Sequence, residues 1–303
     1  MPQADANRVK VSYAAEATFG SAAVSGFKEL PINSSRLAHA KRTVLSARLR
    51  SDRQVPGIIE VGANAEGSIP FELSFSDFNP FLAAAVGGTT SSSTITNGTT
   101  DTFFTLQEEF QDIGGGLQFT GMHVGTMSLN IEAEAIVTGE IGFVGKEAVV
   151  FASGAAVAAS VASTNPIFNA TANVGTLSEG GGTLSNAIRS LTININANRA
   201  PRPAVGHRTP IGVRGGRVEV TGSITAYFEN QTLLNKFIQH TATSLSVPLT
   251  DSAGHTITIN IPYLFYSGGS PDIPGVNEDV MLTMDWMAQR DPSTGNTITF
   301  VMG

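Results

Sequence analysis

The chain has 303 residues, of which 41% are apolar and only 14% are charged, and its formal net charge is −7. This composition supports a sizeable core and excludes a disordered chain. The negative charge argues against a protein that grips the phosphate backbone of nucleic acid, because such proteins carry a basic patch. The absence of cysteine excludes disulfides and thiolate metal sites.

The sequence shows no pattern typical of a targeting or membrane segment. Its start, MPQADANRVK, lacks the basic-then-apolar order of a signal peptide. The longest apolar run, 148–162, is alanine-rich and shorter than the roughly 20 residues that a membrane helix needs. We therefore expect a soluble protein made in a cytoplasm.

The first part of the chain predicts an irregular arm, a long strand and a short helix. Residues 1–45 show little regular patterning and are expected to form the arm. Apolar and polar residues then alternate over 59–75, which is typical of an antiparallel strand with one buried face. Residues 78–86 have helical spacing, with Pro80 in the first turn.

The middle of the chain predicts one more long strand between two low-complexity stretches. Alternation over 128–143 is nearly unbroken and predicts a single strand. The stretches 87–102 and 152–186 are rich in small and polar residues. Because structureless loops of more than about 15 residues are uncommon, we expect them to be contact arms or flexible insertions.

The last part of the chain repeats the order of strand and short helix. Strands are predicted at 190–198 and 217–228, followed by two weaker ones at 256–265 and 279–288. Between these pairs lies a helix capped by Asn230, expected to bury Leu233, Leu234, Phe237 and Ile238.

An internal duplication accounts for this repeated order. Gly67-Ser68-Ile69 recurs 155 residues later as Gly222-Ser223-Ile224, and in both places a strand leads into a short helix. The mid-strand glycines, Gly67, Gly139 and Gly222, predict bends or bulges. We therefore predict a mainly β protein with two related halves, each an antiparallel β-sheet plus a short helix, forming a β-sandwich or barrel. The first half is 1–150 with the N-terminal arm, 151–186 is a flexible linker, and the second half is 187–303.

The polar faces of the predicted strands are dominated by acids. They carry Glu60, Glu66, Glu72, Glu132, Glu134, Glu140 and Glu219 against a single cation, Arg217. One interpretation is ordinary solvated surface. The other is an acidic wall that repels phosphate.

The sequence offers no motif for catalysis. None of the five histidines lies in an HExxH pattern or near a G-x-S-x-G elbow. Asp101, Glu108, Glu109 and Asp112 do not have the spacing of a calcium loop, so a solvated acidic loop is favoured over a cation site. We predict no enzyme activity, no catalytic residue, no cofactor and no metal site.

One basic patch follows the strand at 190–198. It contains Arg199, Arg202, His207 and Arg208 and is too small to hold DNA by itself. An acidic partner, including the glutamates of a neighbouring copy, would fit it.

Several segments in order resemble a known family. The segments Val11-Ser12-Tyr13-Ala14-Ala15-Glu16-Ala17-Thr18-Phe19-Gly20 and Arg50-Ser51-Asp52-Arg53-Gln54 resemble the siphophage major tail tube proteins of long, non-contractile tails. So do the strand leading to Gly67-Ser68-Ile69, the helix 78–86 and the segment from Gly121-Met122 to Gly145-Lys146. The resemblance covers most of residues 8–150 and continues more weakly beyond them.

The resemblance implies a structural protein of the virion tail, assembled in the host cytoplasm from hexameric rings that stack into a tube. Each copy would supply four lumen strands, making 24 per ring, and DNA would pass through the acidic lumen without specific binding. Expected partners are other copies of the chain, the tape measure protein, the tail terminator and baseplate or tail-tip proteins. The candidate lumen residues are Glu60, Glu66, Glu132, Glu134, Glu140 and Glu219. The candidate inter-subunit residues are Arg50, Asp52, Arg53, Arg199, Arg202 and Arg208.

Two alternatives remain open from the sequence. One is a related phage ring protein, such as a tail terminator or the tube of a phage-derived particle. The other is a carbohydrate-binding or glycosidase β-sandwich module, which the single Trp and four Tyr disfavour because such modules usually display surface aromatics.

Overall fold

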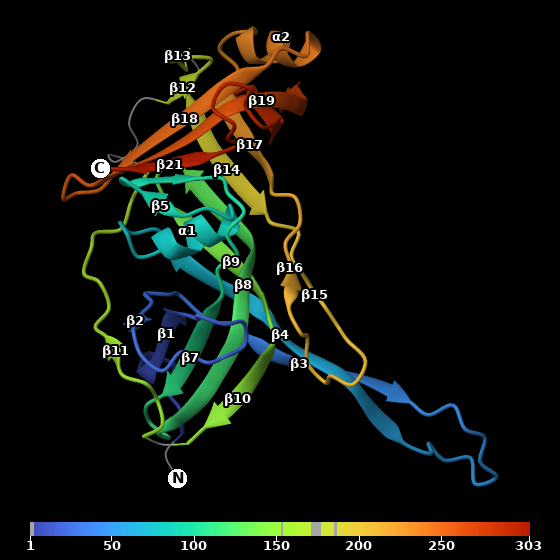
Figure 1. Cartoon of the computed structure of the whole chain (residues 1–303). Helices are drawn as coiled ribbons and strands as arrows, with labels where there is room; N and C mark the ends of the chain where they lie inside the picture. The colour runs from blue at the N-terminus through green and yellow to red at the C-terminus, as the bar shows by residue number, and fades with distance from the viewer. Residues whose placement is uncertain (1–2, 153, 171–176, 185–186) are drawn as a thin grey trace.

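The computed structural model describes residues 3–152, 154–170, 177–184 and 187–303. The chain is mainly β, as predicted, with two short α-helices (Figure 1). Its central layer is one antiparallel sheet in the order β3-β4-β9-β8-β14-β17-β20-β19. These strands are β3 (Ala38–Leu45), β4 (Ile58–Glu72), β9 (Thr138–Gly145), β8 (Gly115–Glu132), β14 (Ile188–Asn196), β17 (Glu219–Tyr227), β20 (Met281–Ala288) and β19 (Thr256–Asp272).

A second layer covers the first half of this sheet. Its strands are β1 (Val9–Ala15), β2 (Phe27–Glu29), β7 (Phe104–Phe110), β10 (Glu147–Phe151) and β11 (Ala159–Ser160), together with the first part of β8. The long strand β8 therefore belongs to both layers, since its later residues pair with β9 and β14.

The second half is covered in the same way. Its outer strands are β18 (Thr243–Thr250), β21 (Thr299–Met302), β12 (Ser178–Glu179) and β13 (Gly182–Thr183), together with the first part of β19. The hairpin of β5 (Thr90–Ser91) and β6 (Thr94–Thr96) comes from the first half, yet β6 pairs with β21. The two halves are therefore joined in both layers.

The core fills the space between the layers. The alternating apolar residues point into it, including Ile69, Phe71, Ile141, Ile224 and Trp286, each almost fully buried. Burial of side chains of this size contributes about 1.5–3 kcal/mol each. The apolar alternation of the sequence therefore identifies the inward face of most central strands.

The two helices differ in how they meet the core. All five central and C-terminal residues of α1 (Asn79–Ala85) are buried, among them Phe81 and Leu82. In α2 (Thr232–Ile238) only Leu233 is fully buried, and Ile238 is 69% exposed. The expectation that Ile238 is buried was therefore wrong, because α2 lies at the rim of the sandwich and contacts mainly β19.

The two predicted halves have the same pattern of strand pairing. Within the first half β4 pairs with β9 and β9 with β8, and in the second half β17 pairs with β20 and β20 with β19. The pairing of β8 with β9 is interrupted between Val124 and Thr126, and that of β19 with β20 between Tyr266 and Gly268, at corresponding places. Bulges also interrupt β7–β8 and β18–β19 at corresponding places. Bulges are specific features of a fold, so their recurrence supports the predicted duplication.

The structure corrects the single strand predicted over 128–143. These residues form the end of β8, a turn at 133–137 and the start of β9. Glu134 lies in that turn with φ of 62°. Alternation continued through the turn because both arms of a hairpin have a period of two, so the sequence pattern hid the reversal.

The N-terminal residues also differ from the prediction. Residues 1–45 are not an irregular arm, because β1, β2 and all of β3 lie within them and β1 pairs along all of β7. Glu16, just after β1, accepts hydrogen bonds from the amides of Gly20 and Gly121, each at 2.8 Å. These contacts hold the segment against the first half.

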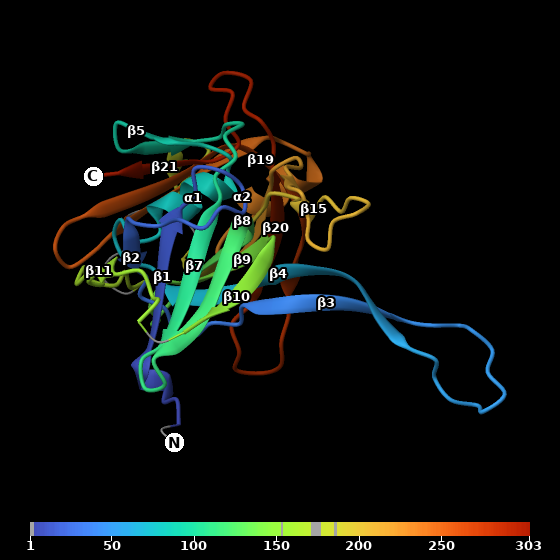
Figure 2. The same cartoon turned by 60° about the horizontal axis from the view of Figure 1, so that its bottom comes forward.

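The projecting element is instead the hairpin of β3 and β4, which extends far from the body in both views (Figures 1 and 2). We call residues 41–63 the arm. Ile59 and Val61, predicted to be buried, are more than half exposed there. A register shift between Arg42 and Thr43 breaks the alternation at this point.

The predicted linker is partly packed against the body. Phe168 is fully buried, and its amide donates to the carbonyl of Leu73 at 2.9 Å. Its residues 153, 171–176 and 185–186 lie outside the described part of the chain. A separate small hairpin, β15 (Ala200–Pro201) with β16 (Val213–Arg214), follows β14, and a 3-10 helix (Ala6–Arg8) precedes β1.

The mid-strand glycines serve close packing and not bulges, because the pairings at Gly67, Gly139 and Gly222 are in continuous register. A Cβ on Gly222 would lie 2.1 Å from the carbonyl oxygen of Thr192 and 2.3 Å from the ring of Trp286. Neither a backbone oxygen nor a buried indole can move away cheaply.

Gly222→Ala is therefore expected to lower the free energy of unfolding by about 1–3 kcal/mol, through overpacking. Denaturant unfolding of the unassembled chain measures this. Gly275→Ala is the matched control, since a Cβ there meets no atom within 4 Å, and it should change the midpoint little. Equal midpoints for both variants would contradict this account of Gly222.

Candidate functional site

The outward face of the central sheet is a continuous polar surface. Cross-strand neighbours form rows that run through both halves, such as Glu140, Ser128, Asn194 and Thr221. A second row contains Thr138, Asn130, Thr192, Ser223 and Asp285. Hydroxyl and amide side chains thus fill most of a face that extends across eight strands. We call it the polar face.

The carboxylates on this face come from both halves. Glu66, Glu132, Glu140 and Glu219, which the sequence identified, lie on it or at its end. Glu60 and Glu134 do not, since Glu60 lies on the arm and Glu134 in the turn after β8. Glu72, predicted on a polar strand face but not among the candidate lumen residues, also lies on this face, as do Asp272 and Asp285, which the sequence pattern did not identify. The alternation of β20, with Leu282, Met284 and Trp286 buried, is the signal that could have identified Asp285.

Two cations partly offset these acids. Arg36 lies 3.8 Å from Glu140, and Arg217 donates to Glu219 at 2.5 Å. The hydrogen bond from Arg217 lowers the pKa of Glu219 below its ordinary value. The pairing with Arg217 therefore favours the ionised form of Glu219, and by formal charge the acids of the face outnumber these two cations.

The ends of the central sheet are unpaired. Among the described strands β3 pairs only with β4, so its other edge is open. At the opposite end, Gly268–Asp272 of β19 pair with β20, and their other edge has no partner strand in the described part of the chain. Open edges carry unpaired amides and carbonyls that can accept a further strand.

The arm exposes many apolar side chains. Those at least half exposed are Val44, Leu45, Leu49, Val55, Ile58, Ile59 and Val61, and Leu49 is 100% exposed. An exposed apolar patch of this size marks an interaction surface. At the tip, Arg50 donates to Asp52, with the closest contact at 2.7 Å, and Arg53 has φ of 58°. Arg50, Asp52 and Arg53 thus lie together where a neighbouring molecule could reach them.

The predicted basic patch is divided by the fold. Arg199 is an internal residue, with a side chain only 5% exposed and paired with Asp101. Arg208 donates to Glu60 at 2.6 Å, so it binds an acid of its own chain. Arg202 is exposed on the loop between β15 and β16. Arg208, which was expected to contact a glutamate of a neighbouring copy, thus contacts a glutamate of its own chain.

Three of the loosely clustered acids bind residues of their own chain. Asp101 pairs with Arg199, Glu108 accepts from the hydroxyl of Ser35, and Asp112 accepts from Arg8. No group of residues suited to a metal ion occurs among the described residues. Within the same residues no helix has the length and hydropathy to cross a membrane.

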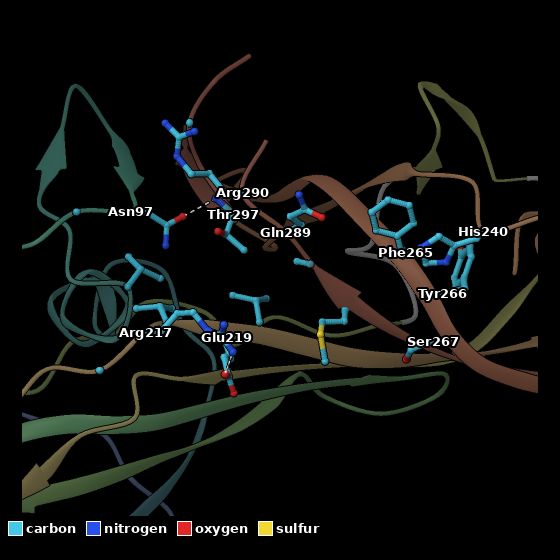
Figure 3. A pocket seen from close by; sticks show the side chains of 18 residues that line it. Asn97, Arg217, Glu219, His240, Phe265, Tyr266, Ser267, Gln289, Arg290 and Thr297 are labelled. Carbon is cyan, nitrogen blue, oxygen red and sulfur yellow. Dashed lines mark hydrogen bonds and ion pairs between the residues drawn. The ribbon is translucent and has the colours of Figure 1, made fainter. Parts of the chain in front are cut away.

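One cavity of about 860 Å³ lies in the second half, where β17, β19 and β20 meet the loop at Asn97 (Figure 3). Val218, Phe265 and Met287 give it apolar walls, and Arg217 and Glu219 lie at one end. The cavity opens to the surface, and its lining also includes His240, Ser267 and Gln289.

The ion pair between Glu60 of the arm and Arg208 of the loop between β15 and β16 is expected to change the pKa of Glu60. The hydrogen bond from Arg208 lowers the pKa of Glu60 below its ordinary value. Arg208→Ala is therefore expected to raise the pKa of Glu60, measured by NMR titration of its side-chain carboxyl. Arg202→Ala, on the same loop, is the control and should leave that pKa unchanged. An unchanged value in both variants would show that the pair does not form in solution.

Comparison with known proteins identifies the family of the chain. Residues 6–288 match the family described as phage tail tube protein. A comparison with curated individual proteins found no match. Because the family match extends over nearly the whole chain and includes both halves, the chain belongs to the phage tail tube protein family.

Proposed function

We propose that copies of this chain close into rings, that the rings stack into the tube of a long non-contractile phage tail, and that DNA passes through the tube. The single observation that supports this best is the continuous eight-stranded sheet, polar on one face and unpaired at both ends. A sheet of this kind buries its open edges by joining copies of itself into a closed barrel.

The size of the sheet favours three copies per ring. The resemblance implied four lumen strands per copy, but the two halves contribute eight strands to one sheet, and we propose that all eight line the lumen. With strands about 4.8 Å apart and tilted about 40°, 24 strands enclose a backbone diameter of about 48 Å. Two copies would enclose about 32 Å and, after side chains, would leave no clearance for a duplex about 20 Å wide. Six copies would enclose about 96 Å, far more than a duplex needs.

The polar face would line the channel. Its carboxylates Glu66, Glu72, Glu132, Glu140, Glu219 and Asp285 would repel the phosphates of passing DNA, and its hydroxyls and amides would make only exchangeable contacts. Low affinity is the property that a conduit requires, since a bound duplex would stop.

The remaining contacts would assemble the tail. The arm, with Arg50, Asp52 and Arg53 at its tip, would bind adjacent copies, and the ends of the tube would meet the tail terminator and the baseplate or tail-tip proteins. A tape measure protein would occupy the lumen before DNA does. Assembly would take place in the host cytoplasm, and the product would be the virion tail.

Removal of apolar surface from the arm should prevent assembly without unfolding the chain. Leu49→Ser with Val55→Ser leaves the core untouched, since both side chains are exposed. We expect an unchanged unfolding midpoint and at least a tenfold loss of tubes by negative-stain electron microscopy. Val205→Ser with Val161→Ser, also at exposed sites, is the control that should still form tubes. Normal tube yield from the arm variant would remove the arm from the assembly mechanism.

Charge reversal on the polar face should make the channel bind the DNA that it is proposed to conduct. Tubes of Glu66→Lys, Glu72→Lys, Asp285→Lys are expected to retain duplex DNA that resists nuclease, and salt should release it. Wild-type tubes should retain none. A control with Glu134→Lys, Glu278→Lys, Asp279→Lys, which lie off this face, should give nuclease-sensitive DNA only. Protection by the control and not by the first variant would show that the polar face is outside the tube.

A further inference from the structure

The duplication supplies a template for the contact between copies. Inside the chain the halves meet where β8 pairs with β14, from Thr126 opposite Asn196 to Glu132 opposite Ser190. In the first half β8 is the last strand of the central sheet, and in the second half β14 is the first. At the open ends of the sheet, β19 is the last strand of the second half and corresponds to β8. β3 is the first strand of the first half and corresponds to β14.

We propose that β19 of one copy pairs with the β3 edge of the next copy in the register that β8 and β14 have within the chain. This inference rests on the proposed ring and adds which strands meet and which residues face each other. The occupant of the open edge is thus a second copy of the same chain.

The bulges fix the correspondence of β8 with β19. Thr126 follows the bulge of β8 and pairs with Gly142, and Gly268 follows the bulge of β19 and pairs with Asp285. Counting onward, Asn130 corresponds to Asp272. The partner strands agree, because Asn130 pairs with Thr138 and Asp272 with Met281, four residues before Gly142 and Asp285.

The repeated Gly-Ser-Ile motif fixes the correspondence of β14 with the β3 edge. Ser223 pairs with Thr192, and its counterpart Ser68 accepts at its carbonyl from the amide of Arg36 at 2.9 Å. Thr192 therefore corresponds to Arg36. Since Asn130 faces Thr192 within the chain, Asp272 of one copy faces Arg36 of the next.

The residues at this position are suited to a contact between chains. Asp272 and Arg36 are both exposed and have opposite charges, whereas the internal pair Asn130 and Thr192 is neutral. Opposite charges directly across an antiparallel pair stabilise it and disfavour other registers. Pro271 lacks an amide, which removes one donor from the open edge and limits indiscriminate pairing before a ring forms.

The same correspondence accounts for the arm. Residues 41–63 correspond to the connection 197–218, which lies back over β4, with the carbonyl of Arg208 accepting from the amide of Ala63 at 2.9 Å. Val218, the counterpart of Ala63, lines the cavity of Figure 3. The arm of the next copy therefore lies over that cavity, and its exposed apolar side chains meet Phe265 and Met287.

A disulfide tests the register, because the chain has no cysteine of its own. Asn130 and Thr192 are at a non-hydrogen-bonded position, since the bonded pairs on either side are Ala197 with Gly125 and Ala133 with Arg189. Opposed residues at such positions have Cα atoms about 4.5 Å apart, within the range of a disulfide. Asn130→Cys with Thr192→Cys is the internal control and should give a cross-linked monomer.

Arg36→Cys with Asp272→Cys, assembled, oxidised and run on a non-reducing gel, should give covalent dimers and a closed trimer. Leu37→Cys with Asp272→Cys places the thiols on opposite faces and should give monomer. Tubes that contain only monomers of the Arg36/Asp272 variant would overturn the register and leave the proposed function standing. An absence of tubes from the wild-type chain would overturn the proposed function itself.

Charge reversal provides a second readout should the cysteine pair prevent assembly. Arg36→Asp and Asp272→Arg alone should each reduce tube yield at least tenfold, and the double variant should restore it. Equal defects in all three would contradict the pairing. For the arm, hydrogen exchange should slow at both 41–63 and 217–220 on assembly, and unchanged exchange at 217–220 would overturn its placement over the cavity.

Discussion

The backbone hydrogen bonds between β8 and β14 are the interaction on which the rest of the structure depends. They join two β-sandwich units into one sheet, so that the polar face runs without interruption from β3 to β19. A sheet of eight antiparallel strands with a twist of constant hand tends to curl, and curling brings its open edges toward other copies. Self-association thus follows from the way in which the halves are joined.

The two faces of the central sheet differ in polarity. Each half places its large side chains, such as Phe71 and Trp286, between two sheets and leaves the other side of the central sheet to hydroxyls, amides and carboxylates. β8 and β19 each pass from one layer to the other, and the bulges after Val124 and Tyr266 lie where they do so. Stability therefore comes from the interior of each sandwich. The charge of the polar face can change without a change in the core.

Much of this could be predicted from alternation and from the repeated Gly-Ser-Ile motif, which report local geometry. The fold class, both helices and four of the six proposed acidic residues follow from them. Glu60 and Glu134 were misplaced because alternation does not reveal a turn or a register shift. The arm was assigned to the wrong residues, and Arg199 to a contact surface, because its partner Asp101 is distant in sequence. Contacts between residues that are distant in sequence depend on the tertiary structure. The alternation of apolar and polar residues along a strand does not predict them.

The central claim is that the polar face of several copies encloses a channel. A cryo-electron microscopy reconstruction of tubes formed by the purified chain tests it most directly. The account predicts rings of three copies, 24 strands around the lumen, and Glu66, Glu140 and Asp285 directed inward. A tube in which these carboxylates face the outer solvent, or a chain that stays monomeric at high concentration, would contradict it.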